Sequence, residues 1–292
     1  MTEIGIECSD AGLKRTGKQA VLRENRKGEV LFLTFPSIEM NQNVIHGFST
    51  RLGGVSKGEF AQMNLSFSRG DVRESVLENY RRIAEAIGFD DRRIVCSDQT
   101  HTVNVRKVTE EDCGKGYLKP RDYADVDGLV TNVPGVMLAT FYADCVPLYF
   151  VDPVHRAVGL SHSGWRGTVG NIAQATVRAM TEQYGTDPKD ITAAIGPSIC
   201  RDCYEVSEDV IVQFQDAYPE HIWEKLFYQK ENGKYQLDLW EACRQNMMRA
   251  GIPEEKIEVT DVCTCCNPGV LFSHRASGGR RGNLAAFLGI RE

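Results

Sequence analysis

A run of short apolar segments in the middle third of the chain constrains the fold most strongly. These segments are RIVCSDQT (93–100), VNVRKV (103–108), DGLVT (127–131), VMLATFYAD (136–144), PLYFVD (147–152) and AVGLSHS (157–163). Their length and their content of β-branched and aromatic residues are typical of buried strands. Helical patterns do not alternate regularly with them, which excludes a simple parallel βαβ array. We therefore expect a mixed α/β fold, with one mixed sheet or a stacked pair of sheets and helices outside.

Helical patterns flank these strands, and no linker divides the chain. Residues 70–88 have helical apolar spacing between the N-cap candidate Asp71 and the stop signal Gly88. A second helix is expected from about Thr168 to Tyr184. Residues 1–28 are polar and weakly patterned, so we expect a loosely packed N-terminal extension there. Residues 29–292 are expected to form a single catalytic α/β domain.

Charge and apolar content narrow the class of protein. The formal net charge of −6 gives no general attraction to nucleic acid or to an anionic membrane. No apolar run is long enough to span a bilayer, and the N-terminus has no signal-peptide core. We therefore expect a cytoplasmic protein, in which most of the ten cysteines are free thiols.

Several of the expected strands end in reactive side chains. His101 follows the first of them, Cys145 follows the fourth, and His162 lies at the end of the sixth. Ligand sites in α/β proteins form where strand ends and loops converge. Three nitrogen and sulfur ligands with one open position describe a catalytic zinc site better than a structural one. Because the spacing contains no compact ligand motif, core or capping roles for these residues stay open.

Several motifs in one order resemble a known family, the YfiH/YlmD family, which is also named the polyphenol-oxidase or laccase-domain family. The match runs from about Ile45 to the C-terminus. The motifs are HGFSTRLGGVS (46–56), QTH (99–101), DGLVT (127–131), ADCVPLYF (143–150), SHSGWRG (161–167), IGPSICRDCYEV (195–206) and CTCCNPGVLFSHR (263–275).

The resemblance implies a fold, an activity and a metal site. It implies a four-layer α/β/β/α sandwich and a zinc-dependent purine nucleoside phosphorylase, which cleaves nucleosides such as adenosine or inosine with inorganic phosphate. Adenosine deaminase and S-methyl-5'-thioadenosine phosphorylase activities are also implied. The family's zinc ligands correspond to His101, Cys145 and His162. Oligomeric state stays open.

Further polar residues in these motifs are candidates for catalysis. Arg51, in STRLGG, is expected to place phosphate or to bind a ribose oxygen. Arg166, beside Trp165, has either a phosphate-binding role or a surface ion pair. Asp144, next to Cys145, either orients a ligand, carries a proton or caps a turn.

Other motif residues are candidates for substrate contact. His46 is either a satisfied strand-end histidine or a substrate contact, and it joins Arg51 and Asn64 as a substrate-binding candidate. Asn64 and Asp127 either brace the backbone or touch substrate.

Two cysteine-rich segments are interpreted as structural. Cys200 and Cys203 form a Cys-x-x-Cys pattern, which suggests a redox or zinc role. The CTCC segment at 263–266 is interpreted as buried or incidental. In this interpretation Cys200 and Cys203 lack a second ligand pair, and we expect them to be structural thiols.

Three other functions are compatible with the same residues. Two histidines and a cysteine can bind copper, so a copper-dependent polyphenol oxidase (laccase) is one alternative. The six histidines include no His-x-His pair, which disfavours a multicopper oxidase. A hydrolase with Cys145 as nucleophile and His162 or His101 as base is a second alternative. A non-catalytic nucleoside-binding module is the third.

Overall fold

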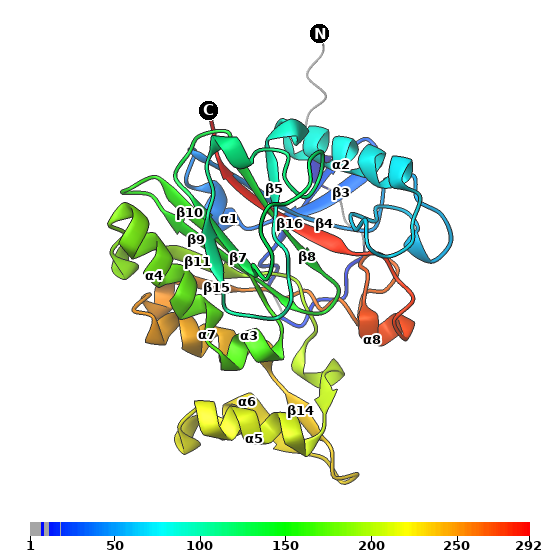
Figure 1. Cartoon of the computed structure of the whole chain (residues 1–292). Helices are drawn as coiled ribbons and strands as arrows, with labels where there is room; N and C mark the ends of the chain where they lie inside the picture. Colours follow the sequence, from blue (N-terminus) through cyan, green and yellow to red (C-terminus); the bar gives the residue numbers. More distant parts are fainter. Residues whose placement is uncertain (1–6, 9–11, 18) are drawn as a thin grey trace.

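Two mixed β-sheets pack face to face at the centre of the computed structural model, which describes residues 7–8, 12–17 and 19–292 (Figure 1). The first sheet has seven strands, in the order β1 (Glu7–Cys8), β2 (Arg23–Lys27), β3 (Val30–Thr34), β4 (Val44–Ser49), β16 (Leu284–Ile290), β8 (Met137–Tyr142) and β5 (Ile94–Cys96). The second has six, in the order β15 (Ile257–Val259), β11 (Thr192–Ile195), β9 (Val146–Asp152), β10 (Ala157–Ser163), β7 (Gly128–Thr131) and β6 (Val105–Lys107).

Strand pairing in both sheets is mostly antiparallel, with parallel pairs at the edges. Strand β5 runs parallel to β8, β6 to β7, and β11 to β15. Strands β9 and β10 are buried along their whole length. They are covered on both faces, which explains why their sequences read as continuous apolar runs rather than as alternating ones.

The core between the two sheets comes from their inner faces. Leu138 and Leu288 of the first sheet share one apolar cluster with Tyr149, Val158 and Leu160 of the second. Each of these side chains is fully buried. The two sheets therefore form the inner layers of the fold.

Helices cover the two outer faces. The helices are α1 (Pro36–Glu39), α2 (Arg73–Ile87), α3 (Trp165–Val169), α4 (Ile172–Tyr184), α5 (Glu208–Ala217), α6 (Trp223–Leu226), α7 (Leu239–Arg249) and α8 (His274–Ser277). Helix α2 packs its apolar side chains on the first sheet, and α4 and α7 pack theirs on the second. The order of layers is therefore α/β/β/α, as the resemblance implied.

A small lobe extends from the second sheet, drawn in yellow in Figure 1. It contains α5, α6 and a three-stranded sheet in the order β12 (Glu205–Val206), β14 (Tyr235–Leu237) and β13 (Phe227–Gln229). Phe214, Leu226 and Leu237 of the lobe belong to the same apolar cluster as Met247 of α7. The lobe thus shares a core with the rest of the domain.

The structure corrects three expectations about local structure. Helix α2 has Val72 and not Asp71 at its N-cap, and the Asp71 carboxylate instead accepts hydrogen bonds from Ser56 and Asn64. The helix expected from about Thr168 to Tyr184 is two helices, because Asn171 adopts a left-handed conformation (φ 60°) between α3 and α4. The Asn171 side chain then accepts a hydrogen bond from the Gln174 N–H and caps α4. Strand β2 lies inside the segment expected to be a loose extension, and the neighbouring Leu22 is buried in the central core. The boundary expected at residue 28 therefore falls between two paired strands. Among the described residues, no helix combines the length and the apolar character that crossing a bilayer requires.

Candidate active site

Three side chains from separate segments meet at one end of the two sheets. His101 follows β5, Cys145 immediately precedes β9, and His162 lies near the end of β10. One ligand atom from each lies within 4.8 Å of the others. The Cys145 Sγ is 3.8 Å from the His101 Nε2, and the two imidazole rings are nearly perpendicular, with centroids 5.0 Å apart. The predicted convergence of these strand-end residues is therefore present in the structure.

Gly164 explains why small residues follow His162 in the SHSGWRG segment. A Cβ atom on Gly164 would lie 2.6 Å from the His101 Cδ2 and 3.2 Å from the Cys145 Sγ. The Gly164 backbone is extended (φ −77°, ψ 177°), a conformation that any residue can adopt. Glycine is needed here because a side chain would collide with its neighbours, and not because the backbone is unusual. The segment turns tightly from β10 into α3 while leaving room for the cluster.

Asp127 orients two of the three side chains. One carboxylate oxygen lies 2.8 Å from the His162 Nδ1. The same carboxylate accepts hydrogen bonds from the backbone N–H groups of Thr100, His101 and Thr102. His101 is thereby held in a left-handed backbone conformation (φ 67°). Asp127 fixes the His162 ring so that Nε2 faces Cys145 and His101, an arrangement that is usual behind metal-binding histidines.

Charges within the cluster favour a thiolate at Cys145 and a protonated ring at His162. Burial raises the pKa of the Cys145 thiol, but His162 and His101 more than offset this and lower it to about 6. Burial lowers the pKa of His162, whereas Cys145 and Asp127 raise it, to about 9. Cys145 is thus a thiolate at neutral pH, and a divalent cation can take the place of the proton on His162.

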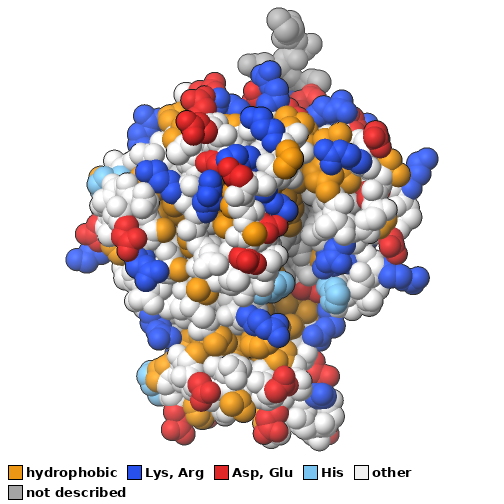
Figure 2. All heavy atoms as spheres, viewed as in Figure 1, with side chains coloured by type: hydrophobic (Ala, Val, Ile, Leu, Met, Phe, Trp, Pro, Cys, Tyr) orange, Lys and Arg blue, Asp and Glu red, His pale blue; other side chains and the backbone are white. Residues whose placement is uncertain are grey.

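A cavity of about 290 Å³ opens beside the cluster. His101, Cys145 and His162 line one side, and the loop of residues 65–69 lines another. Figure 2 shows histidine and basic side chains around a hollow near the middle of this face. The volume lies near the lower end of the range for small-molecule sites.

Three arginines that were not among the residues predicted from the sequence line this cavity. They are Arg69, Arg121 and Arg281. Arg121 is already paired with Asp98 at 2.7 Å. Arg281 is buried, and its Nε has no hydrogen-bond partner within the described part of the chain. Burial and the nearby Arg69 lower the pKa of Arg281 to about 10. Two neighbouring cations, one of them desolvated, make this wall of the cavity suitable for an anion.

The two arginines chosen from the sequence do not line the cavity. The Arg51 guanidinium donates to the backbone carbonyls of Ala61 and Pro268 and lies over the Phe272 ring. Arg166 is exposed on α3 and lies over the Trp165 ring at 4.2 Å. The structure therefore gives Arg51 a bracing role, and it gives Arg166 the surface position that was one of its two alternatives.

His46 and Asn64 also have structural partners. His46 is buried in β4, where its Nε2 accepts a hydrogen bond from the Phe35 N–H at 2.8 Å. Burial lowers the pKa of His46 to about 3, so its ring is neutral. Asn64 is buried behind the cavity wall, and its Oδ1 accepts from the N–H groups of Ser66 and Asn283. Neither residue lines the cavity, and Asn64 shapes it indirectly.

Asp144 faces away from the cavity. Its carboxylate accepts hydrogen bonds from the Thr264 hydroxyl and from the Arg275 N–H, both at 2.7 Å. Its backbone is left-handed (φ 96°). These contacts fix the turn that presents Cys145, so Asp144 has a positioning role in the structure.

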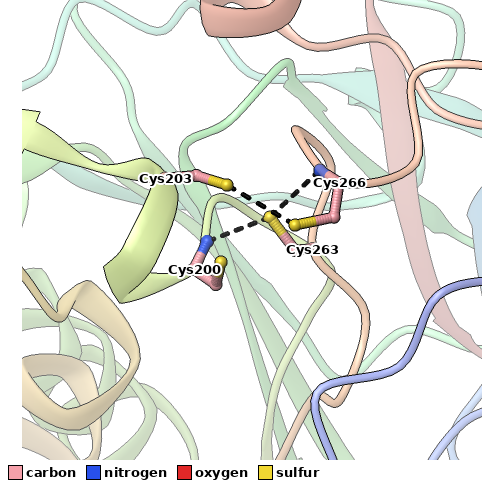
Figure 3. A group of neighbouring side chains, drawn as sticks. All are labelled: Cys200, Cys203, Cys263 and Cys266. Carbon is pink, nitrogen blue, oxygen red and sulfur yellow. Dashed lines mark hydrogen bonds between the residues drawn. The ribbon is translucent and has the colours of Figure 1, made fainter.

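Four cysteines form a second group of potential metal ligands, which was not predicted from the sequence. Cys200, Cys203, Cys263 and Cys266 lie together with their sulfur atoms within 4.8 Å of one another (Figure 3). The CTCC segment contains a second Cys-x-x-Cys pair, so the expectation that Cys200 and Cys203 lack one was wrong. The equal spacing of the two pairs is the sequence signal that identifies the group.

Comparisons with known proteins identify the family of this chain. The fold and the cluster define a mixed α/β protein with a candidate metal centre at the strand ends. A family model described as multi-copper polyphenol oxidoreductase laccase matches residues 45–291. The chain belongs to this family, which confirms the resemblance to YfiH and YlmD proteins.

Individual relatives carry names of enzymes. The chain is 41% identical over 255 residues to purine nucleoside phosphorylase YlmD of Geobacillus stearothermophilus, covering 85% of this chain and 90% of that protein. The crystal structure of YlmD from this organism matches with a TM-score of 0.84 at 38% identity, over 96% of this chain and 100% of that one. Adenosine deaminase RL5, from an unknown prokaryotic organism, is 34% identical over 84% of this chain and 93% of its own length.

Proposed function

We propose that this protein is a zinc-dependent purine nucleoside phosphorylase that cleaves nucleosides such as adenosine or inosine with inorganic phosphate. The observation that carries the proposal is the meeting of His101, Cys145 and His162 beside a cavity that is also lined by arginines. The phosphorylase names of close relatives support the choice of reaction.

The cluster fits zinc by its donor chemistry. Two imidazole nitrogens and one thiolate, with a fourth position facing a cavity, are a usual donor set for catalytic zinc. Asp127 supplies the carboxylate partner that such a histidine ligand needs. When bound, zinc supplies Lewis-acid polarisation of a substrate atom. The residues that hold it are His101, Cys145 and His162.

Phosphorolysis requires a phosphate fixed beside the ribose. A phosphate oxygen forms a bond to the anomeric carbon, the bond from that carbon to the purine nitrogen breaks, and the base leaves with the electron pair. Arg281 and Arg69 are the cavity groups suited to hold the phosphate, because both are cations that line the cavity, whereas Arg121 is already paired with Asp98. Placing phosphate in this way lowers the entropic cost of the reaction.

A second activity, adenosine deamination, is favoured by the relative named adenosine deaminase. It would use the same cavity and metal site, with water in place of phosphate. S-methyl-5'-thioadenosine is a further nucleoside substrate to test. We also propose a cytoplasmic location, since the cysteines whose side chains the structure describes form no disulfide bonds.

The laccase and hydrolase alternatives have less support. The described residues form two groups of side chains that could bind a metal ion, one with two histidines and one with none. Neither offers the many histidines of a multicopper site. The Cys145 thiolate beside two histidines would suit a nucleophile, so that alternative requires its own test.

Product analysis with adenosine tests the proposed reaction. In phosphate buffer we expect adenine and ribose 1-phosphate, and in phosphate-free buffer no release of adenine. Inosine and ammonia formed without phosphate would report the deaminase activity. Equal release of adenine with and without phosphate, with free ribose as product, would contradict the proposal.

A further inference from the structure

The four-cysteine group joins two loops that follow neighbouring parallel strands. Cys200 and Cys203 lie in the loop after β11, and Cys263 and Cys266 lie in the loop after β15. The parallel pairing continues past both strands, because Ser198 and Cys263 form a β-bridge and the Thr264 N–H donates to the Ser198 carbonyl at 3.0 Å. The sheet itself therefore brings the two Cys-x-x-Cys pairs together (Figure 3).

The sulfur atoms are spaced for a metal ion and not for a disulfide. Four sulfurs at about 2.3 Å from a central zinc lie about 3.8 Å apart. In the structure all four lie within 4.8 Å of one another, and the Sγ atoms of Cys203 and Cys266 are 3.4 Å apart. A disulfide would require about 2.05 Å. Cys200 and Cys263 are buried, whereas Cys203 and Cys266 are half-buried, which leaves a path from solvent.

Backbone groups around the cluster are aimed at sulfur. The N–H groups of Cys200 and Cys266 donate to the Cys263 Sγ at 3.2 Å and 3.4 Å (Figure 3). Such donors stabilise a thiolate, because they partly neutralise its charge. Arg275 adds a cation nearby, since its guanidinium donates to the carbonyl of Cys203 at 3.1 Å.

We propose that Cys200, Cys203, Cys263 and Cys266 bind a structural zinc ion, separate from the cluster at the cavity. Binding converts four thiols to thiolates with the release of four protons, and the resulting complex is doubly negative. With four protein ligands the coordination is closed, so the ion cannot accept a substrate. This inference does not rest on the proposed function.

The position of this site indicates what the ion would stabilise. The Ile199 N–H donates to the Asp144 carbonyl at 3.0 Å, and the Thr264 hydroxyl donates to the Asp144 carboxylate. Both cysteine loops thus hold the turn that presents Cys145. The small lobe starts directly after Cys203, at β12. The ion fastens the base of this lobe and the turn before Cys145 to the second sheet.

Metal analysis of four proteins tests the inference. Wild type, washed free of loose metal, is expected to hold about two zinc ions per chain, one in each site. Cys203→Ser should lose the ion of the four-cysteine site, whereas Cys203→His should keep it, because imidazole is a good zinc ligand and a hydroxyl is not. Cys113→Ser is the matched control, since Cys113 is also a half-buried free cysteine but belongs to neither cluster, and it should keep both ions.

A measurement on the wild-type protein covers the case in which Cys203→Ser does not fold. All four thiols should resist alkylation until a chelator removes zinc, and the release of zinc and the labelling of Cys203 and Cys266 should rise together. X-ray absorption on Cys145→Ser should show only sulfur neighbours, at about 2.3 Å. The inference is overturned by one zinc per chain in wild type with Cys203→Ser unchanged, by labelling without metal release, or by iron as the bound metal.

Discussion

Replacing Gly164 with alanine tests the geometry of the cavity cluster with one added methyl group. The new Cβ would lie 2.6 Å from the His101 Cδ2, where an ordinary carbon–carbon contact is about 3.5–4.0 Å. The His101 ring must therefore move by about 1 Å. The Gly164 backbone is extended, so alanine adds no conformational strain of its own.

The size of the effect follows from this overlap. Metal ligands hold their distances to within about 0.2 Å, so a shift of about 1 Å removes His101 from a shared coordination shell. Overpacking of this kind costs about 1–3 kcal/mol. That cost corresponds to zinc binding weakened about five- to 150-fold at this site. Activity with adenosine and phosphate should fall in parallel.

Chelator competition measures the zinc affinity, and thermal unfolding reports whether the variant is folded. Gly167→Ala is the matched control, because its Cβ would meet nothing closer than 3.5 Å. Alanine also favours the helix in which Gly167 lies by about 1 kcal/mol. Wild-type zinc affinity and activity in folded Gly164→Ala would refute the reasoning.

Three further perturbations test other parts of the account. Asp127→Asn should weaken zinc binding about 10- to 100-fold with little change in secondary structure, measured by chelator competition, because it removes the carboxylate partner of His162; an unchanged affinity would contradict this. Arg281→Gln should raise the KM for phosphate about tenfold or more, whereas Arg178→Gln, an exposed residue on α4, should not; equal effects would remove Arg281 from phosphate binding. Burial lowers the pKa of His46 to about 3 in the folded protein, whereas in the unfolded chain it is about 6.5. As the pH falls below about 6.5, His46 of the unfolded chain therefore binds a proton and His46 of the folded protein does not. The contribution of neutral His46 to the free energy of unfolding is complete above about pH 6.5 and is lost as the pH falls toward about 3. The difference in unfolding free energy between wild type and His46→Gln should therefore shrink by about 2 kcal/mol from pH 7 to pH 5 in denaturant titrations, and a constant difference would contradict it.

Strand ends were the most informative part of the sequence. His101, Cys145 and His162 could be predicted to converge because apolar strands end beside each of them, and the structure brings their ligand atoms together. The resemblance implied the four layers, whereas strands that do not alternate with helices indicated only one mixed sheet or a stacked pair of sheets. The break between α3 and α4 was not predicted, because Asn171 must adopt a left-handed conformation that its neighbours do not reveal.

The roles of the arginines could not be predicted from the sequence. A motif places Arg51 near a strand end, but only the structure shows that its donors are satisfied by the carbonyls of Ala61 and Pro268. Arg281 stands in no motif, yet it lines the cavity. The direction of a long flexible side chain depends on distant packing, so local sequence does not determine it.

Zinc content and activity of Cys145→Ser, measured on one preparation, test the central claim most directly. If Cys145 is a ligand of the catalytic zinc, this variant should lose that ion, keep the one at the four-cysteine site, and lose phosphorolysis together with any deamination. Metal-free wild type should also regain activity on addition of zinc. If Cys145→Ser instead keeps the full zinc content of wild type and has no activity, Cys145 acts as a nucleophile, and the proposed zinc site is contradicted.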